Sequence, residues 1–339
     1  MISLYAGEER QRKVDRIGDP LAALSASVNF QTIADAVSAV LPKADFSRGG
    51  RPPFAVVLMI KMLVLKQLYN LSDDQVEYQA LDRASFQRFL GLSSSSRIPD
   101  AKTFWAFQQT LTKAGAAQAI TEAVQQQLAQ AGYIARSGQL IDATIVRAPV
   151  QHYTKTEKDT LERGEIPADW SPAKRAQKDV DANWTKKHGK SYFGYKAHAS
   201  ADVRHKLARK VAVTPAAVHD TNHFEDLLDA TNTSREVSAD KGYVDRERET
   251  RLKAKGWRVR VQRKAAQGRS LSDCQGRRNT RIAKVRARVE HLFAGLHQMG
   301  GLMIRTIGLA RAQFQIATKL AVYNLKRWMS LRACGIAAF

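Results

Sequence analysis

Three acidic residues stand in places that are unusual for a carboxylate. Asp142 lies in the middle of the apolar stretch LIDATIV, where an unpaired charge is costly. Asp240 ends the stretch REVSAD directly before a Lys-Gly turn. Glu290 is the only acid between Cys274 and Phe339, a segment that contains twelve Lys and Arg. Carboxylates in such places pair with a cation or coordinate a metal, and ligands that are all oxygen atoms suit Mg²⁺ or Mn²⁺.

Two strands and one helix are predicted to position these acids. QLIDATIVRAP alternates as a strand that stops at Pro149, and REVSAD is a second strand. In open α/β sheets, ligands bind at the ends of such strands. The predicted helix of residues 280–299 places Glu290 beside an apolar stripe, in line with Arg286 one turn earlier. The stripe consists of Ile282, Val285, Val289, Leu292, Phe293 and Leu296. Glu290 would therefore point into the groove between helix and sheet.

Each acid also has an ordinary structural interpretation. Asp142 could be hydrogen-bonded in a turn, Asp240 could cap the next helix, and Glu290 could pair with Arg286. These interpretations explain the acids one at a time. The occurrence of all three on this order of strands and helix favours a shared cation site.

The other elements predicted in the C-terminal part complete a mixed sheet. SYFGYKAHASAD and KLARKVAVTPAAV predict a hairpin that turns around residues 203–205, and WRVRVQRK predicts a last strand. DTNHFEDLLDAT, capped by Asp220, and DRERETRLKAKG predict helices, followed by a final helix of about residues 310–331. Residues 151–190 are polar and predict a long loop or insertion. The order β, ββ, α, β, α, β, α matches the ribonuclease H-like fold, an α/β class in which helices flank a mixed sheet.

The N-terminal part predicts an all-α domain. The apolar segment FAVVLMIKMLVLKQLY follows Pro52 and Pro53, Ser72 and Gln75 form a capping box, and Asp100 caps a further helix. Short helices joined by tight turns fit either a helix-turn-helix DNA module or a scaffold for dimerisation. We therefore predict two domains, residues 1–134 and residues 135–335, the second interrupted by the polar insertion.

The charge of the chain is distributed unevenly. The net charge is +22, and residues 134–339 contain 40 of the 54 Lys and Arg but only 20 of the 32 Asp and Glu. Such a surplus favours a polyanionic partner, either nucleic acid or an anionic membrane surface. The basic residues alternate with strand and helix patterns and do not form a polybasic tail, which favours nucleic acid.

Cysteine content and hydropathy indicate the compartment. Cys274 and Cys334 lie sixty residues apart without a CxxC pair, which argues against a zinc site or a disulfide framework and fits a reducing cytoplasm. The most apolar segment, which starts at Phe54, contains Lys61 and Lys66 and is too short for a bilayer span. We predict a cytoplasmic protein, associated with the nucleoid when bound to DNA, and no membrane partner.

Several blocks of the sequence resemble a known family. IDATIV, KSYFGYKAH, AVHDTNHFEDLL, SADKGY and RARVEHLFAGL are similar, in this order, to the blocks of DDE transposases of bacterial insertion sequences, in the group named after insertion sequence five. The helical segment PPFAVVLMIKMLVLKQLYNLSDDQVEYQALDRASFQRFLG resembles the domain that precedes their catalytic domain. The resemblance covers roughly residues 48–330.

The resemblance implies a chemistry and a set of partners. Asp142, Asp240 and Glu290 would be the DDE triad and would hold two Mg²⁺ or Mn²⁺ ions. The enzyme would cleave the inverted-repeat ends of its element and transfer the 3′-OH ends into target DNA. Its partners would be double-stranded DNA and further copies of itself, as a homodimer or a higher assembly in a synaptic complex.

The helix signature of the family is only partly present. It reads Tyr, two residues, Arg, three residues, Glu, six residues, Lys. Arg286 and Glu290 match it, whereas Ala283 and His297 stand at the Tyr and Lys positions. The metal ligands are thus retained and two DNA-contacting positions are altered. Expected DNA contacts are Arg286, His297, Arg278, Arg281, Lys241 and Lys196.

Four further residues and two rival functions stay open. His198 and His219 could contact phosphate or be structural and capping histidines. Trp170 and Trp184 could stack on an extruded base or pack ordinarily. The rivals are a domesticated, non-catalytic DNA-binding regulator and a ribonuclease or junction-resolving nuclease of the same fold.

Overall fold

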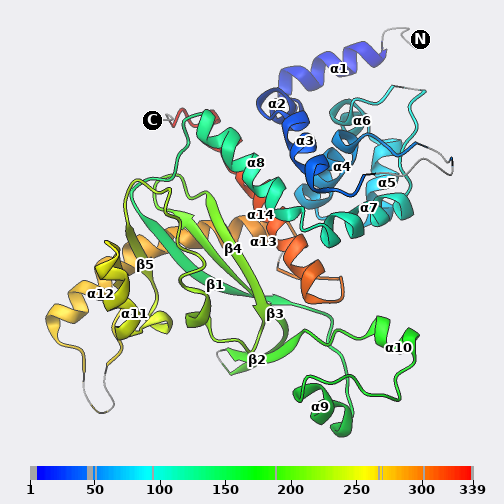
Figure 1. Cartoon of the computed structure of the whole chain (residues 1–339). Coiled ribbons are helices and arrows are strands. Elements are labelled where there is room, and N and C mark those ends of the chain that lie inside the picture. Colours follow the sequence, from blue (N-terminus) through cyan, green and yellow to red (C-terminus); the bar gives the residue numbers. More distant parts are fainter. Residues whose placement is uncertain are drawn as a thin grey trace. The chain divides into compact units, whose positions relative to one another are not determined.

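The computed structural model of the protein describes most of the chain. The described residues are 6–43, 49, 52–93, 95–187, 189–265, 268, 270–300 and 302–336. They form two compact units, coloured along the chain in Figure 1. The helical unit comprises Met1–Leu128 and Leu325–Ala337, and the sheet unit comprises Ala129–Asn324 with Ala338–Phe339. The long helix α14 (Leu309–Ala333) contributes residues to both units.

The helical unit is built from short, individually capped helices. They are α1 (Ala6–Ile17), α2 (Pro20–Ser27), α3 (Phe30–Val40), α4 (Val56–Tyr69), α5 (Asp73–Asp82), α6 (Ala84–Leu90), α7 (Ala101–Lys113) and α8 (Ala117–Gln130). The predicted capping box of Ser72 and Gln75 is confirmed at the start of α5, and Asp100 caps α7 through the amide of Thr103. Gly91 ends α6 with a φ of 75°, a left-handed conformation that favours glycine.

The two lysines of the apolar helix α4 have specific partners. Lys66 Nζ donates to Asp73 Oδ1 and to Gln108 Oε1, both at 2.7 Å. Lys61 Nζ donates to the carbonyl of Phe89 at 2.9 Å, and burial lowers the pKa of this lysine. These contacts explain how an otherwise buried helix tolerates two cations.

No helix in the described part of the chain has the length and apolar character needed to cross a bilayer.

The sheet unit contains a mixed, six-stranded sheet in the order β2-β3-β1-β5-β6, with β4 also paired to β3. The strands are β1 (Gln139–Arg147), β2 (Asn183–Lys187), β3 (Lys190–Asp202), β4 (Ala208–Pro215), β5 (Glu236–Ala239) and β6 (Arg258–Val261). The pairs of β3 with β1, β2 and β4 are antiparallel, whereas β1, β5 and β6 are parallel. The remaining elements are α9 (Lys155–Glu162), α10 (Pro172–Gln177), η1 (Asp220–His223), η2 (Lys241–Tyr243), α11 (Arg246–Ala254), α12 (Asp273–Arg286), η3 (Ala287–Val289) and α13 (Glu290–Gln298). This is the predicted ribonuclease H-like architecture.

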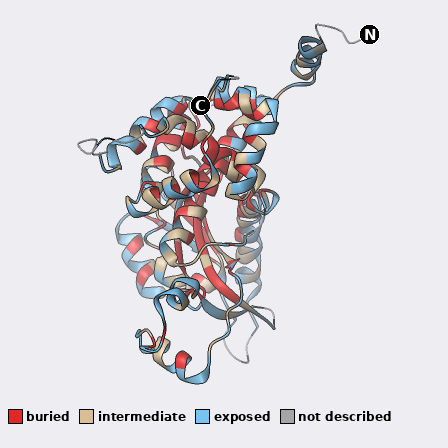
Figure 2. Ribbon diagram, turned by 90° about the vertical axis from the view of Figure 1, so that its right-hand side faces the viewer, coloured by how far each residue is buried: buried red, intermediate tan, exposed pale blue. Residues whose placement is uncertain are grey.

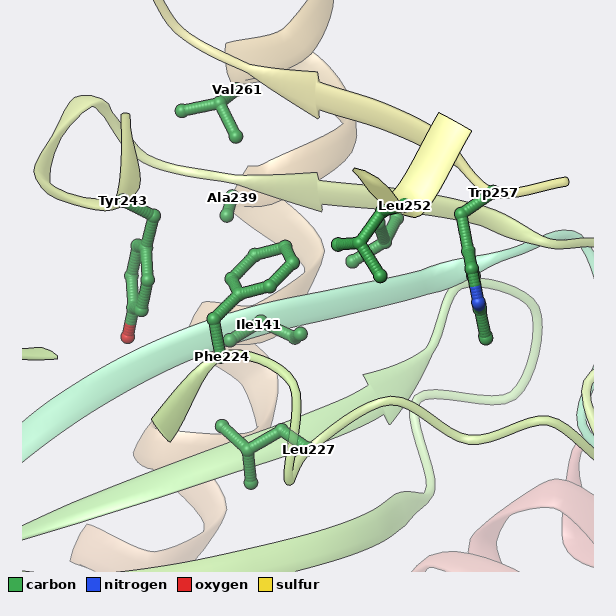
Figure 3. Close-up of a cluster of buried hydrophobic side chains, with 9 residues drawn as sticks. Ile141, Phe224, Leu227, Ala239, Tyr243, Leu252, Trp257 and Val261 are labelled. Atoms are coloured by element: carbon green, nitrogen blue, oxygen red, sulfur yellow. The ribbon is translucent and has the colours of Figure 1, made fainter. Parts of the chain in front are cut away.

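Alternate residues of β1 belong to two different cores. Ile141 lies in the larger cluster, together with Phe224, Val237 and Leu252 of α11 (Figure 3). Leu140 lies in the smaller cluster, with Val289 from the helix region that follows α12. Because side chains alternate along a strand, α11 and the α12–α13 region cover opposite faces of the sheet. Figure 2 shows buried residues concentrated along the strands.

One predicted helix of the sheet unit is not formed. The predicted helix DTNHFEDLLDAT is wrong, because only the short 3₁₀ turn η1 forms there, with His219 as its N-cap. The amide of Asp229 donates to Gln139 Oε1 on β1, and Asn232 bonds the backbone of Gly138. Long-range partners thus replace the helical hydrogen bonds of this segment.

The insertion predicted as irregular is in fact partly ordered. It contains α9, α10 and β2. Tyr153 stacks on Trp170 with ring centroids 6.1 Å apart, and Trp170 Nε1 donates to Glu157 at 2.8 Å. Hydrogen bonds from Lys174, the amide of Thr154 and Trp170 lower the pKa of Glu157 to about 2. A small local core therefore organises this segment.

The predicted helix of residues 280–299 is confirmed in its buried face but not in its continuity. Val289 and Leu292 are buried as expected. The 3₁₀ turn η3 separates α12 from α13 immediately before Glu290. Such a tightened turn within a helix often marks a functional site.

Candidate active site

The register of two parallel strands brings two of the candidate carboxylates together. Gln139 pairs with Val237 and Leu140 pairs with Ser238. Two residues further along both strands, the same register places Asp142 beside Asp240. Both side chains then lie on the sheet face that carries Leu140, which α12 and α13 cover.

Asp142 is half-buried and bonded on both oxygens. Its Oδ1 accepts from the amide of Ala143 at 2.9 Å, and its Oδ2 accepts from Arg286 Nη2 at 2.9 Å. Burial raises the pKa of Asp142, the Arg286 cation opposes this shift, and the negative charge of Asp240 adds to it. The Asp240 carboxylate is therefore close enough to disfavour the ionisation of Asp142.

Asp240 has the capping role considered from the sequence. Its carboxylate accepts from the amide of Gly242 and caps η2. A Cβ on Gly242 would lie 2.8 Å from Asp240 Oδ1, so this turn needs glycine for the carboxylate to close on the amide. The cap orients the side chain at the strand end next to Asp142. Capping and cation binding are compatible here because the cap uses one oxygen.

Glu290 occupies the first position of α13 and is exposed. Its alternative pairing with Arg286 is not formed, because Arg286 binds Asp142 and donates from Nη1 to Gln262 Oε1 at 3.1 Å. Within the described ranges, Glu290 makes no ion pair. No three His, Cys, Asp or Glu side chains gather as a metal site in that part of the chain either. The structure thus joins Asp142, Asp240 and Arg286, and Glu290 follows one helical turn after Arg286.

Apart from Arg286, which binds Asp142, the side chains expected to contact DNA fall into two groups. Lys196 Nζ donates to the carbonyl of Val218 at 2.8 Å and lies 2.9 Å from Asp220 Oδ1, and Arg278 Nη1 donates to the carbonyl of Val261 at 2.8 Å. These two side chains have structural partners. The exposed members are Lys241, Arg281 and His297.

Residues 134–325 match the model of a protein family described as the transposase DDE domain. The chain belongs to this family. A second model, the transposase domain (DUF772), matches residues 8–110. The group named after insertion sequence five stays a prediction.

Among solved structures, this transposase is similar to the piggyBac transposase in a cryo-EM structure of its synaptic complex with hairpin DNA. The two sequences are 10% identical, and the TM-score is 0.43. The match covers 94% of this chain and 74% of the piggyBac chain.

For three of the four residues left open, the structural role is present in the transposase. His198 is fully buried, bonds Thr214 Oγ1 at 2.9 Å, and has its pKa lowered to about 4 by burial, so it is neutral near pH 7. His219 Nδ1 accepts from the amide of Thr221. Trp170 packs in the insertion. Trp184 on β2 is 48% exposed and lies beside an aromatic ring of β3.

Asp220 is a fourth acid of this region that sequence reasoning assigned only to a helix cap. The buried hydroxyl of Tyr243 has its pKa raised first by burial and then by the negative charges of Asp220, Asp142 and Asp240. Asp220 is also the acid that faces Lys196. Its sequence signal was weak, because the contact with Lys196 depends on how η1 packs beside the hairpin.

Proposed function

We propose that this transposase cleaves the inverted-repeat ends of its own insertion sequence and joins the freed 3′-OH ends to target DNA. The observation that carries the proposal is the parallel register of β1 and β5, which places Asp142 beside Asp240 directly after the end of β5. They lie under the helix region that contributes Arg286 and Glu290, in the part of the chain with a net charge of +20.

The carboxylates fit a divalent cation by their chemistry. All candidate donors are oxygen atoms, as Mg²⁺ and Mn²⁺ prefer. Burial, followed by the negative charge of Asp240, raises the pKa of Asp142, and a cation between the two carboxylates would relieve both effects. Two ions would be held by Asp142, Asp240 and Glu290, whose exposed side chain starts α13 and is unpaired within the described residues. Such ions, when bound, activate water and stabilise the leaving oxygen.

The basic residues of the site have separate tasks in this proposal. Arg286 keeps Asp142 ionised and oriented before the cation arrives, because it donates to Oδ2. Lys241, Arg281 and His297 are exposed and contact phosphates. Lys196 contacts phosphate from its position beside the Val218 carbonyl and Asp220.

We further propose that residues 1–134 form the domain for end binding or dimerisation and residues 135–335 the catalytic domain. The family match to a second transposase domain over residues 8–110 supports a dedicated N-terminal function. A homodimer or higher assembly would bring two element ends together. Its DNA partners would be the terminal repeats and the target duplex.

The test is Mg²⁺-dependent nicking of a duplex that carries the terminal repeat flanking the gene. Asp142→Ala, Asp240→Ala and Glu290→Ala should each bring nicking below detection, while DNA binding persists because no phosphate contact is removed. Glu247→Ala, which removes an exposed acid of α11, is the matched control and should cut normally. Nicking at the wild-type rate by any of the three variants would remove that residue from the site.

Because Glu290 is exposed, the two rival functions also need a test. A non-catalytic DNA-binding regulator would bind the repeat without cutting it at any metal concentration. Wild-type protein that binds the repeat tightly and never nicks it would establish that rival. A nuclease of the same fold would instead cut unrelated duplexes or RNA hybrids as fast as the repeat.

A further inference from the structure

A second basic surface of the sheet unit lies away from the carboxylates, between α11 and the last strand of the sheet, β6. A pocket of about 480 Å³ opens there. Its walls include Arg246 and Lys253 from α11, with Arg258 and Arg263 from β6 and the residues after it. We call these residues and the space between them the α11–β6 pocket.

The charge of the α11–β6 pocket is largely uncompensated. Glu249 is the acid among its lining residues, and it already holds Arg263 through two hydrogen bonds of 2.9 and 2.7 Å. Arg246, Lys253 and Arg258 are exposed and form no ion pair within the described ranges of the chain. Three exposed cations therefore line one open pocket, which attracts a multiply charged anion.

The spacing of these cations suits a polymer of phosphates. Arg246 and Lys253 are seven residues apart on one helix, so they lie on the same face with a rise of about 10 Å between them. Phosphates of one DNA strand repeat every ~3.4 Å along the duplex axis. Laid parallel to the duplex axis, the row from Arg246 to Lys253 would span about three nucleotides, with Arg258 also lining the pocket from β6.

The outer edge of β6 adds a backbone donor to the same space. β6 is the terminal strand of the sheet. The amides of Arg258 and Gln262 donate to carbonyls of Arg235 and Ala239 on the β5 side. Because amides alternate along a strand, the N–H of Val259, which lines the pocket, points away from β5. Outward amides beside cations are the donors that proteins use for phosphate oxygens.

The wall of the α11–β6 pocket is anchored in the core. Trp257 lines the pocket, yet it is only 8% exposed and packs in the cluster with Leu252 (Figure 3). The backbone on both sides of the pocket is therefore held in place by buried residues, so the cations extend from a rigid frame. A rigid frame lowers the ordering cost of binding.

We infer that the α11–β6 pocket binds the phosphate backbone of duplex DNA without reading its bases. The inference uses the proposed function only for the identity of the polyanion. Cations and backbone amides contact phosphates that are alike in every sequence, so this site contributes affinity and salt dependence and leaves end recognition to other residues.

The test compares two double variants of the full chain by fluorescence anisotropy with EDTA present. Lys253→Glu with Arg258→Glu reverses two pocket cations. Lys155→Glu with Lys158→Glu makes the same charge change on α9, at two exposed lysines that alternate with acids. Each protein is titrated with a terminal-repeat duplex and a scrambled duplex across a salt series, and thermal unfolding verifies the fold.

The pocket variant should bind both duplexes about tenfold more weakly per lost contact at roughly 0.1 M salt, with the salt slope reduced by about 0.9 per contact. The α9 variant should keep the wild-type slope. Unchanged binding, an equal loss in the α9 variant, or a loss confined to the terminal repeat would overturn the inference. If the reversed variant does not fold, Lys253→Gln with Arg258→Gln should show the same loss of slope.

EDTA separates this inference from the proposed function. No strand cleavage occurs in the binding assay, so its outcome does not depend on the carboxylates. A chain that never nicks DNA but shows the pocket-dependent slope would retain the α11–β6 pocket and lose the proposed chemistry. Normal nicking by the wild type, together with an unchanged salt slope in the pocket variant, would retain the proposed chemistry and remove the α11–β6 pocket as a DNA site.

Discussion

The helical unit and the sheet unit use polar residues in different ways. In the described part of the helical unit, the buried polar side chains are Gln67, Gln108 and Gln127, all of them uncharged. The sheet unit buries acids, histidines and cations among its strands, including Asp202, His205 and Arg209. In the described residues the helical unit therefore buries uncharged polar side chains, whereas the sheet unit also buries charged ones that need partners. The candidate site belongs to the second kind.

The largest expected effect tests the buried polar contacts of the sheet unit. Asp202 is fully buried, accepts from the amides of His205 and Leu207 at 2.6 and 3.0 Å, and faces Arg209. Asp202→Ala should lower the free energy of unfolding of this unit by about 3–5 kcal/mol, because buried donors and a cation lose their acceptor. Urea unfolding measures the loss. Asp202→Asn, which keeps an acceptor, should cost less, and equal costs would contradict the explanation.

A smaller effect should be the same in both units. Ser72 starts α5 and Ser272 starts α12 with the same capping box, each completed by a glutamine three residues later. Ser72→Ala and Ser272→Ala should each lower the free energy of unfolding by about 1 kcal/mol. The two variants serve as controls for each other. A cost several times larger at Ser272 would show that local caps, too, are used differently in the sheet unit.

Asp142 of the candidate site should lower the stability of the folded protein when it is ionised. Burial, against the opposing Arg286 cation, raises the pKa of Asp142 in the folded state, so ionisation is less favourable there than in the unfolded chain. Asp142→Asn should therefore have a higher Tm than the wild type at about pH 8. The difference should shrink as the pH falls through the raised pKa toward the unfolded value of about 3.9, below which the wild type is protonated in both states.

The control for this pH dependence is Glu290→Gln. Glu290 is exposed, so its replacement should leave the Tm unchanged between roughly pH 4 and pH 8. Calorimetry of both variants gives the two profiles. An Asp142→Asn protein that is less stable than the wild type at every pH would show that the bond to Arg286 outweighs the cost of burial.

The smallest expected effect concerns His297, an exposed residue in the last turn of α13 where the family signature has lysine. Histidine side chains change charge between about pH 5 and pH 8. His297→Lys should therefore tighten binding to the terminal repeat a few-fold at roughly pH 8.5 and change it little at about pH 6. Gln298→Lys adds the same charge one residue later and should lack this pH dependence. Parallel profiles would leave His297 as a residue that complements the helix end.

Much of the fold is predictable because its signals are local. The alternation in LIDATIV, the caps at Ser72 and Asp100, and the stripe through Val289 each depend on residues a few positions apart. The helix predicted after Asp220 does not form, because contacts of this segment to β1 outweigh its helical pattern. The insertion was misread as irregular because Trp170 and Glu157 are thirteen residues apart, beyond any helical or strand period.

The candidate site also has features that are local in the sequence and features that depend on distant residues. The sequence by itself determined that acids occur in an apolar strand, at a strand end and in a basic helix, because residue type and hydrophobic period are properties of short segments. Only the tertiary structure decided that Asp142 lies beside Asp240 and that Arg286 pairs with Asp142, 144 residues away, in preference to Glu290 at the start of the next helix. The physical reason is that strand register and helix packing select partners across the sheet, and a half-buried carboxylate gains more from a cation than an exposed one does.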